Sequence, residues 1–300
     1  AKFNFTNLMT FIRNLPGSLL IFLGALSLSF GGLIVKSFEG ATLWQILFWR
    51  SLFFSLTVLA FLIISYRTKT IESFYKSGLP GFVGGIILSF GFCGYVFAMY
   101  NTTVANTNFI ISLQILFLAI FGYFFLKEKI NLITLFSICL AMTGVLLMVG
   151  NSLSPGELSG NLAAFTMPIT FAVLIMIVRK FPSVDMVPAQ FVAGVSSCLI
   201  GFLLSTKIMI SPHDIFLGFL AGFFQVGFGF IFITIGARTT PSAMVGIIML
   251  SESVLGPIWA FLFVSERPSV FGLIGGAIIL SAVLLQFYSL LSKQKKIVSD

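Results

Sequence analysis

The chain has 300 residues, of which 58% are hydrophobic and only 9% are charged. A soluble domain carries about 25% charged residues because its surface must face water. The composition therefore excludes an ordinary soluble domain and predicts a membrane protein. The formal net charge of +8 does not indicate nucleic-acid binding, since the basic residues occur singly or in short clusters between apolar runs.

Apolar runs of about 20 residues, the length that crosses a bilayer as a helix, recur along the whole chain. The uncharged stretch 77–126 would be about 75 Å long as one helix, so we expect it to turn at the polar residues 100–103. We therefore predict an all-α membrane protein with ten transmembrane helices, approximately at 15–35, 42–66, 78–99, 104–126, 130–150, 161–178, 186–206, 215–237, 242–264 and 268–291.

Residues 102–147 and 240–285 repeat one pattern at a separation of 138 positions, which places Glu128 on Glu266 and Gln114 on Glu252. Two homologous membrane halves are typical of secondary transporters. We expect the following domains: a cytoplasmic N-terminal segment 1–14, a first repeat 15–150 with helices 1–5, a connector 151–160, a second repeat 161–291 with helices 6–10, and a cytoplasmic basic tail 292–300.

The lysines and arginines predict the orientation. With ten spans and a cytoplasmic N-terminus, 13 of the 17 fall on the cytoplasmic side and three outside, with Arg50 left inside a span. The positive-inside rule then places both termini in the cytoplasm. Because each half has an odd number of spans, the two repeats are inverted relative to each other.

Two ionisable residues are expected inside the bilayer, where such groups are costly and usually functional. Glu252 lies at the centre of the ninth span, and burial there favours its neutral form, so it is either a hydrogen-bonded structural acid or a carrier of a proton or cationic group. Arg50 lies in the outer half of the second span, where it either joins helices or binds an anion. Gln114, the repeat partner of Glu252, is the neutral side of the same expected site.

Weaker candidates surround these residues. Trp259 follows Glu252 by two helical turns on the same face, where it packs, lines a cavity or stacks on a cationic ligand. Polar side chains within spans usually hydrogen-bond between helices. The remaining candidates for substrate binding or coupling are Trp49, Ser251, Ser253, Asn108 and Gln225. Glu128 and Glu266 are interpreted as markers of helix ends.

Metal and cofactor sites are not expected. Cys93, Cys139 and Cys198 lie in three separate apolar runs without metal-ligand spacing, and the single histidine, His213, lies in a connector. No membrane-embedded nucleophile and base are paired, so we do not expect an enzyme.

Several tracts resemble the drug/metabolite transporter superfamily, in its EamA-like branch: Phe-Trp-Arg at 48–50, Leu-Lys-Glu-Lys at 126–129, Ser-Glu at 251–252 and Ser-Glu-Arg-Pro at 265–268. The resemblance covers about residues 15–290. It implies a basket-shaped bundle in which spans 1–4 and 6–9 surround a central cavity, with spans 5 and 10 at the periphery. It also implies transport of small metabolites, often amino acids.

We therefore expect a secondary transporter of a small polar metabolite, an amino acid or a derivative, that works by alternating access in a bacterial inner membrane. The alternative is a proton-coupled transporter of lipophilic or quaternary cations built on Glu252; a passive pore or an intramembrane enzyme is more remote. No ATP-binding Gly-x-x-x-x-Gly-Lys-Ser/Thr motif occurs, so protons, another coupling ion or solute gradients supply the energy. Expected partners are the substrate and membrane lipid but no nucleic acid, and a homodimer is possible.

Overall fold

The computed structural model describes residues 15–127, 132–150, 155–240 and 242–299. Its regular elements are helices, and no strand occurs in these ranges, which confirms the all-α prediction. In chain order they are α2 (Gly17–Ser29), α3 (Gly31–Lys36), α4 (Leu43–Tyr66), the 3-10 turn η1 (Arg67–Lys69), α5 (Thr70–Asn101), α6 (Val104–Ile111), α7 (Gln114–Leu126), α8 (Leu132–Gly150), α9 (Pro155–Ala164), α10 (Thr166–Lys180), α11 (Val187–Leu204), α12 (Pro212–Phe219), the π-helix η2 (Leu220–Phe228), α13 (Gly229–Ala237), α14 (Ser242–Val264) and α15 (Val270–Ser299).

Seven segments of the described chain are long and apolar enough to cross a membrane: Gly17–Lys36, Leu43–Asn101, Val104–Phe125, Gly156–Lys180, Val187–Leu204, Pro212–Ala237 and Met244–Val264. The second of these has 59 residues, and it is interrupted at Arg67 and Gly78, which both have positive φ angles. Two further apolar helices, Leu135–Leu147 and Val270–Ala282, are shorter. The expected count of ten spans therefore stays a prediction.

The stretch 67–77, which connects the second and third expected spans, is mostly helical. η1 and the first turns of α5 occupy it, and Lys76 pairs with Glu72 one turn away at 2.8 Å. Such a pair supports an exposed helix only weakly. The real break is Gly78, whose φ of 55° and ψ of −157° suit a residue without a side chain.

The polar residues 100–103 do separate two helices, since α5 ends at Asn101 and α6 begins at Val104. The first helix of the second half begins earlier than expected: α9 starts at Pro155, six residues before the expected span 161–178. Proline is favoured in the first helical turn, where its missing N–H leaves no hydrogen bond unmade. At the C-terminus, α15 continues to Ser299, through most of the expected tail.

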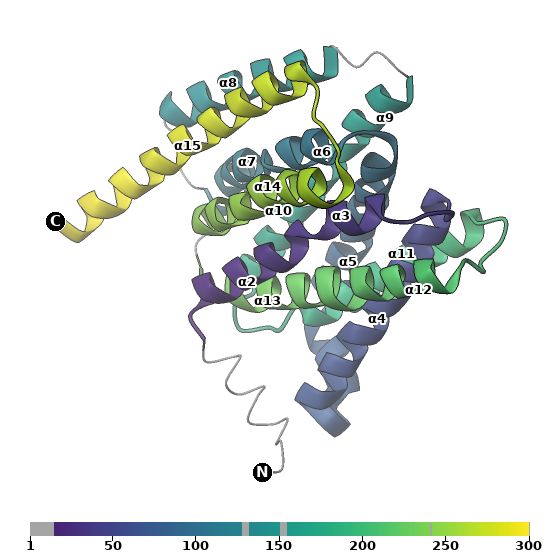
Figure 1. Cartoon of the computed structure of the whole chain (residues 1–300). Helices are drawn as coiled ribbons and strands as arrows, with labels where there is room; N and C mark the ends of the chain where they lie inside the picture. Colours follow the sequence, from purple (N-terminus) through teal and green to yellow (C-terminus); the bar gives the residue numbers. More distant parts are fainter. Residues whose placement is uncertain (1–14, 128–131, 151–154, 241, 300) are drawn as a thin grey trace, which may run out of the picture.

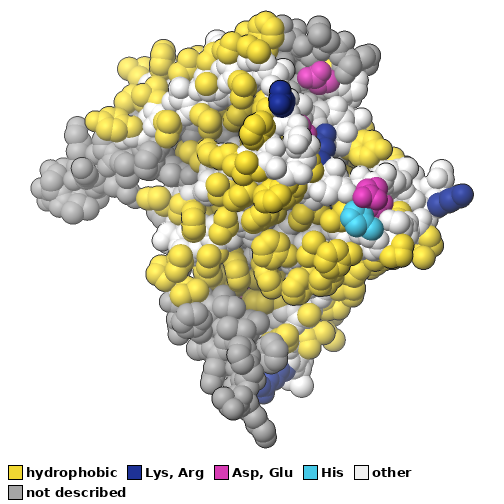
Figure 2. Space-filling view, viewed as in Figure 1, with side chains coloured by type: hydrophobic (Ala, Val, Ile, Leu, Met, Phe, Trp, Pro, Cys, Tyr) yellow, Lys and Arg dark blue, Asp and Glu magenta, His cyan; other side chains and the backbone are white. Residues whose placement is uncertain are grey.

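The outer surface is apolar between two polar ends. Phe124, Leu132 and Leu203 are 69%, 83% and 69% exposed, which soluble proteins rarely tolerate in a continuous belt. Figure 2 shows hydrophobic side chains over most of the visible face, with the few charged side chains mainly in its upper right part. This distribution fits a protein surrounded by lipid.

Helix α2 packs against helix α13 (Figure 1). The first of these belongs to the first half of the chain, residues 15–150, and the second to the second half, residues 155–299. Gly24 lies against Gly229, where an added Cβ would be 2.7 Å from the carbonyl oxygen, and Gly17 lies against Gly236 at 2.6 Å. Numbers rise along one helix as they fall along the other, so the two helices are antiparallel.

The interface of α5 with α9 and α10 has the same form. Gly94 lies against Ala163 and Gly84 against Ile177, with added Cβ atoms at 2.9 Å in both cases. A shift of 138 residues carries α2 onto α9 and the beginning of α10, and the end of α5 onto η2 and α13. The same shift therefore carries the interface of α2 with α13 onto the interface of α10 with α5. Both interfaces are antiparallel, as inverted repeats require.

The helices α8 and α15 pack on each other and lie side by side at the edge of the bundle (Figure 1). A Cβ added at Gly144 would be 2.7 Å from the carbonyl oxygen of Gly275. This close approach leaves the other helices to surround the centre of the molecule.

Gly222→Ala is expected to lower the free energy of unfolding by roughly 1–3 kcal/mol, the usual cost of overpacking. Its Cβ would clash with the backbone oxygen of Arg50 and lie 2.6 Å from the Cβ of Phe53, and backbone cannot rotate away as a side chain can. Thermal unfolding in detergent measures the change. Gly40→Ala is the control, because nothing lies within 4 Å of the added carbon; equal melting temperatures for both variants would contradict the expectation.

Candidate functional site

Several helices are interrupted in the middle of the bundle. α2 and α3 meet at Phe30, α6 and α7 at residues 112–113, and α9 and α10 at Phe165. Residues 220–228 form the π-helix η2. Interrupted helices and π-helical turns occur often at membrane binding sites, because they free backbone groups and redirect side chains. The breaks therefore indicate where a site lies.

Arg50 is positioned by the first turns of α4. Thr42 and Gln45 form a reciprocal capping box at the start of this helix, and the Gln45 amide also donates a 2.8 Å hydrogen bond to the Lys207 carbonyl. Both contacts fix the helix end. Five residues further on, Arg50 points into the protein and is only 3% exposed.

Two aromatic rings of α5 hold the Arg50 guanidinium. Its central carbon lies 5.2 Å from the ring centre of Phe92 and 5.1 Å from that of Tyr95. Cation–π contacts of this kind are worth about 0.5–2 kcal/mol. They do not use the N–H groups, and the buried Nε atom of Arg50 has no hydrogen-bond partner among the described residues.

Glu252 lies on α14 and is 5% exposed. Its charge interacts with that of Arg50, but no direct ion pair joins the two among the described contacts. Glu252 does not therefore serve as the fixed counter-ion of Arg50 in this conformation. The site holds one buried cation and one buried acid at a distance from each other.

Three further predicted residues contribute buried polar atoms without a hydrogen-bond partner in the described chain: Nε2 of Gln114, Oε1 of Gln225 and Oγ of Ser253. Gln114 begins α7 at the break after α6, and Gln225 lies in η2. Nε2 of Gln225 donates a 3.3 Å hydrogen bond to the Leu28 carbonyl, which confirms the expected bonding between helices. Buried polar atoms without partners cost free energy, so these three atoms are candidates for contact with a polar ligand.

Aromatic side chains connect the break at Phe30 to α14. The Phe30 ring stacks on Trp259 at 5.1 Å and lies 5.9 Å from Phe224 of η2. The Trp259 indole donates a 3.0 Å hydrogen bond to Ser29. Trp259, on the same helix α14 as Glu252, therefore packs against the break between α2 and α3.

Three predicted residues make contacts with other parts of the protein backbone or of the helix packing. The Trp49 indole donates to the Ile208 carbonyl at 2.9 Å and so holds the connector after α11. Ser251 bonds to the Ile248 carbonyl within its own helix. The Asn108 amide lies against Gly256, where α6 packs tightly on α14.

Sequence reasoning missed Phe92, Tyr95 and Phe30. No local signal distinguishes them, because the chain contains 37 phenylalanines and six tyrosines. The repeat singles out Phe92 alone, because the shift of 138 positions places it on Phe230 but places Tyr95 on Ile233 and Phe30 on Pro168.

Contacts between the halves also occur at the two ends of the bundle. At one end, called the Lys36 end, Glu266 accepts a 2.6 Å hydrogen bond from the Val104 N–H and lies 3.6 Å from the Lys36 ammonium. Lys36 also donates to the Thr102 carbonyl at 2.8 Å. Glu266 thus stabilises a helix end, as expected; Glu128 lies outside the described residues.

At the opposite end, called the Asp185 end, the Tyr66 hydroxyl at the end of α4 donates to the Asp185 carboxylate in the connector after α10. Arg238, just after α13, donates a 3.0 Å hydrogen bond to the Pro182 carbonyl. The buried centre is therefore closed at both ends by polar contacts.

Comparisons with known proteins agree with this architecture. A protein of known crystal structure has a TM-score of 0.66 at 19% identity, over 90% of this chain and 96% of the other, a similarity of fold alone. An uncharacterized transporter of Methanothermobacter thermautotrophicus is 27% identical over 207 residues, which cover 63% of this chain and 58% of the relative. The match thus spans less than two thirds of that relative's length.

Residues 15–150 and 154–288 each match the model of the EamA-like transporter family. The two matches lie on the two halves that were expected from the internal repeat. The chain therefore belongs to the EamA-like transporter family, as the resemblance in its sequence predicted.

Proposed function

We propose that this membrane transporter carries a small polar metabolite, an amino acid or a derivative of one, as a secondary transporter. The observation that carries the proposal is the buried Arg50 guanidinium, whose Nε has no hydrogen-bond partner and whose faces contact two aromatic rings. A buried charge without a counter-ion is costly. A substrate carboxylate supplies that counter-ion and matches the guanidinium with two parallel hydrogen bonds.

Glu252 is the partner for the amine of such a substrate. It is buried on α14, and its charge interacts with that of Arg50 without a direct ion pair. A zwitterion brings both charges at once, so each buried group gains a counter-ion in the same event. The amides of Gln114 and Gln225 offer further hydrogen bonds.

The second candidate is a proton-coupled transporter of lipophilic or quaternary cations. The observation that favours it is the aromatic series of Phe224, Phe30 and Trp259, on the last of which a cation can stack near Glu252. In that case the substrate needs the carboxylate and the rings but not Arg50.

Counterflow into proteoliposomes tests both candidates. The panel contains amino acids, quaternary amines and nucleosides, each measured with and without a pH gradient. Counterflow of amino acids supports the first candidate, and counterflow of quaternary amines alone supports the second. Counterflow of neither class would overturn both.

Alternating access requires each end of the bundle to open in turn. The contacts that join the halves are the ones that must break: Glu266 with Lys36 and Val104 at the Lys36 end, and Tyr66 with Asp185 at the other. We propose that these two sets of contacts are the gates.

Glu266→Gln is expected to open the Lys36 end more often. Loss of the charge weakens contacts worth about 1–2 kcal/mol, so amide hydrogen exchange over residues 102–108 should become roughly 5–30 times faster. Exchange over residues 181–187 should stay unchanged. The matched control is Glu39→Gln, whose exposed side chain lies at the same end; equal effects of the two variants would rule out a specific gate.

We also propose ten spans with both termini in the cytoplasm of a bacterial cell, supported by the distribution of basic residues. A cysteine placed at Glu157 is then expected to react with an impermeant maleimide added outside, and one placed at Arg179 is not. The reverse pattern would refute this topology, whatever the substrate.

A further inference from the structure

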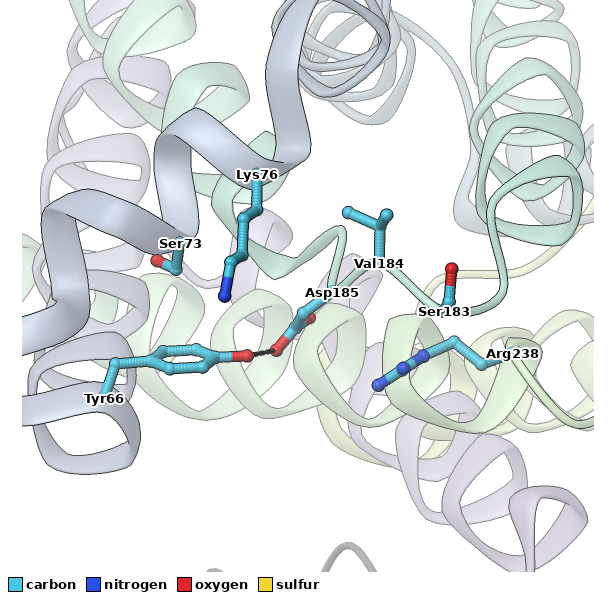
Figure 3. A pocket seen from close by; sticks show the side chains of 7 residues that line it. All are labelled: Tyr66, Ser73, Lys76, Ser183, Val184, Asp185 and Arg238. Carbon is cyan, nitrogen blue, oxygen red and sulfur yellow. Dashed lines mark hydrogen bonds between the residues drawn. The ribbon is translucent and has the colours of Figure 1, made fainter.

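A cavity of about 330 Å³ lies at the Asp185 end, between α4, α5 and the connector after α10. Figure 3 shows Lys76 and Arg238 reaching toward Asp185 from opposite sides, with Tyr66 bonded to the carboxylate. Lys76 belongs to the first half of the chain, and Asp185 and Arg238 belong to the second. The cavity is therefore a junction between the halves.

Positive charge dominates around this cavity although a carboxylate lines it. Asp185 accepts hydrogen bonds from the Tyr66 hydroxyl and from the Val187 N–H, the latter at 3.0 Å. Both of its oxygens are thus engaged. The surrounding segments 66–76, 179–186 and 238 carry six cations and two carboxylates, a net charge of +4. A field of this sign favours an anion.

The two cations that line the cavity keep donors for such an anion. Arg238 uses its Nε for the Pro182 carbonyl, and this contact leaves the two terminal nitrogens of the guanidinium directed to the cavity (Figure 3). Lys76 pairs with Glu72 at 2.8 Å, with its side chain 68% exposed, and an ammonium has three donors.

A second cavity of about 300 Å³ shares Arg238 with the first. Its other lining is mainly aliphatic and includes Leu15, Leu20 and Ile235, at the interface of α2 with α13. A cationic cavity and an aliphatic one thus meet at a single arginine. This combination matches an amphiphile with an anionic head.

We propose that the two cavities together bind one anionic phospholipid. Its phosphate lies between Lys76 and Arg238, and part of its acyl or glycerol region fills the aliphatic cavity beside α2. Basic sites between membrane helices recognise lipid head groups in this way. Because the head group contacts both halves, the bound lipid stabilises the closed Asp185 end. The proposal does not depend on which substrate is transported.

Native mass spectrometry of the purified full chain in micelles with equal amounts of phosphatidylglycerol and phosphatidylcholine tests the proposal. We expect the parent to retain phosphatidylglycerol at least about tenfold better, since phosphatidylcholine carries the same phosphate but adds a choline cation, which the positive charge around the cavity repels. The double variant Lys76→Gln/Arg238→Gln should show no preference. The control Lys207→Gln/Arg267→Gln removes two exposed charges that lie outside the segments around the cavity and should behave as the parent.

Two further measurements keep the result interpretable. The exchange Lys76→Arg/Arg238→Lys keeps both charges and should restore the preference, which separates lost binding from lost folding. An unchanged preference in the Gln double variant would overturn the proposal. So would stabilisation of the parent by millimolar inorganic phosphate without any preference for phosphatidylglycerol, which would assign the cavity to a soluble anion.

Discussion

Arg50→Lys is expected to weaken the binding of a zwitterionic substrate by roughly 10- to 100-fold. Lysine keeps the charge but loses the planar pair of donors that a carboxylate uses, and each factor of ten corresponds to about 1.4 kcal/mol. The exchange also gives up the cation–π contacts of the guanidinium with Phe92 and Tyr95. Isothermal titration with an amino acid found in the counterflow panel measures the affinity.

A quaternary amine provides the internal comparison, because it has no carboxylate and should bind the variant as well as the parent. Arg267→Lys is the matched substitution at an exposed arginine and should change neither affinity. Thermal unfolding of both variants shows whether the fold is kept. If a folded Arg50→Lys variant binds both ligands as the parent does, Arg50 only joins helices and the amino-acid proposal loses its main support.

Glu252→Gln is expected to abolish uptake driven by a pH gradient and to retain exchange of substrate for substrate only at a raised substrate concentration. The glutamine keeps the size and the hydrogen-bonding ability of the side chain, but it can neither release a proton nor form an ion pair. Exchange does not require net proton movement, so it survives when coupling is lost, but it needs more substrate because the amine has lost its counter-ion. Uptake and exchange are measured on the same proteoliposomes with a radiolabelled substrate.

Glu39→Gln serves as the control, since it removes an exposed carboxylate far along the sequence from α14 and should leave both activities unchanged. Wild-type uptake by Glu252→Gln, with the same dependence on pH, would leave Glu252 a purely structural role. Exchange at the parent's substrate concentration, with uptake lost, would instead mean that the carboxylate carries the proton but does not hold the substrate's amine.

Helix interruptions show where sequence reasoning stopped. The polar residues 100–103 predicted the end of α5 because backbone can leave a helix more easily beside polar groups. The breaks at Phe30 and at residues 112–113 lie inside apolar runs, where each residue favours a continuous helix equally. Packing between helices that are distant in the sequence decides where these two breaks lie. The hydrophobic pattern of the sequence does not contain that information.

The candidate site divides in the same way. Glu252 and Arg50 could be selected from the sequence because an ionisable residue in an apolar run is rare and costly. The separation of their charges, and the two rings that hold Arg50, depend on the packing of α4, α5 and α14. Trp49, next to Arg50 in the chain, points instead to the connector at Ile208, since neighbours on a helix face different directions.

The sequence by itself determined the class of protein, the positions of most helices and the two-fold repeat, because hydrophobic length and spacing are local properties that a bilayer reads directly. It also identified the two buried charges. Only the tertiary structure decided which helices are broken, which aromatic rings contact Arg50 and which polar residues connect the halves at either end. Those contacts join residues up to 230 positions apart, and their energies depend on side chains that meet only after the helices have packed.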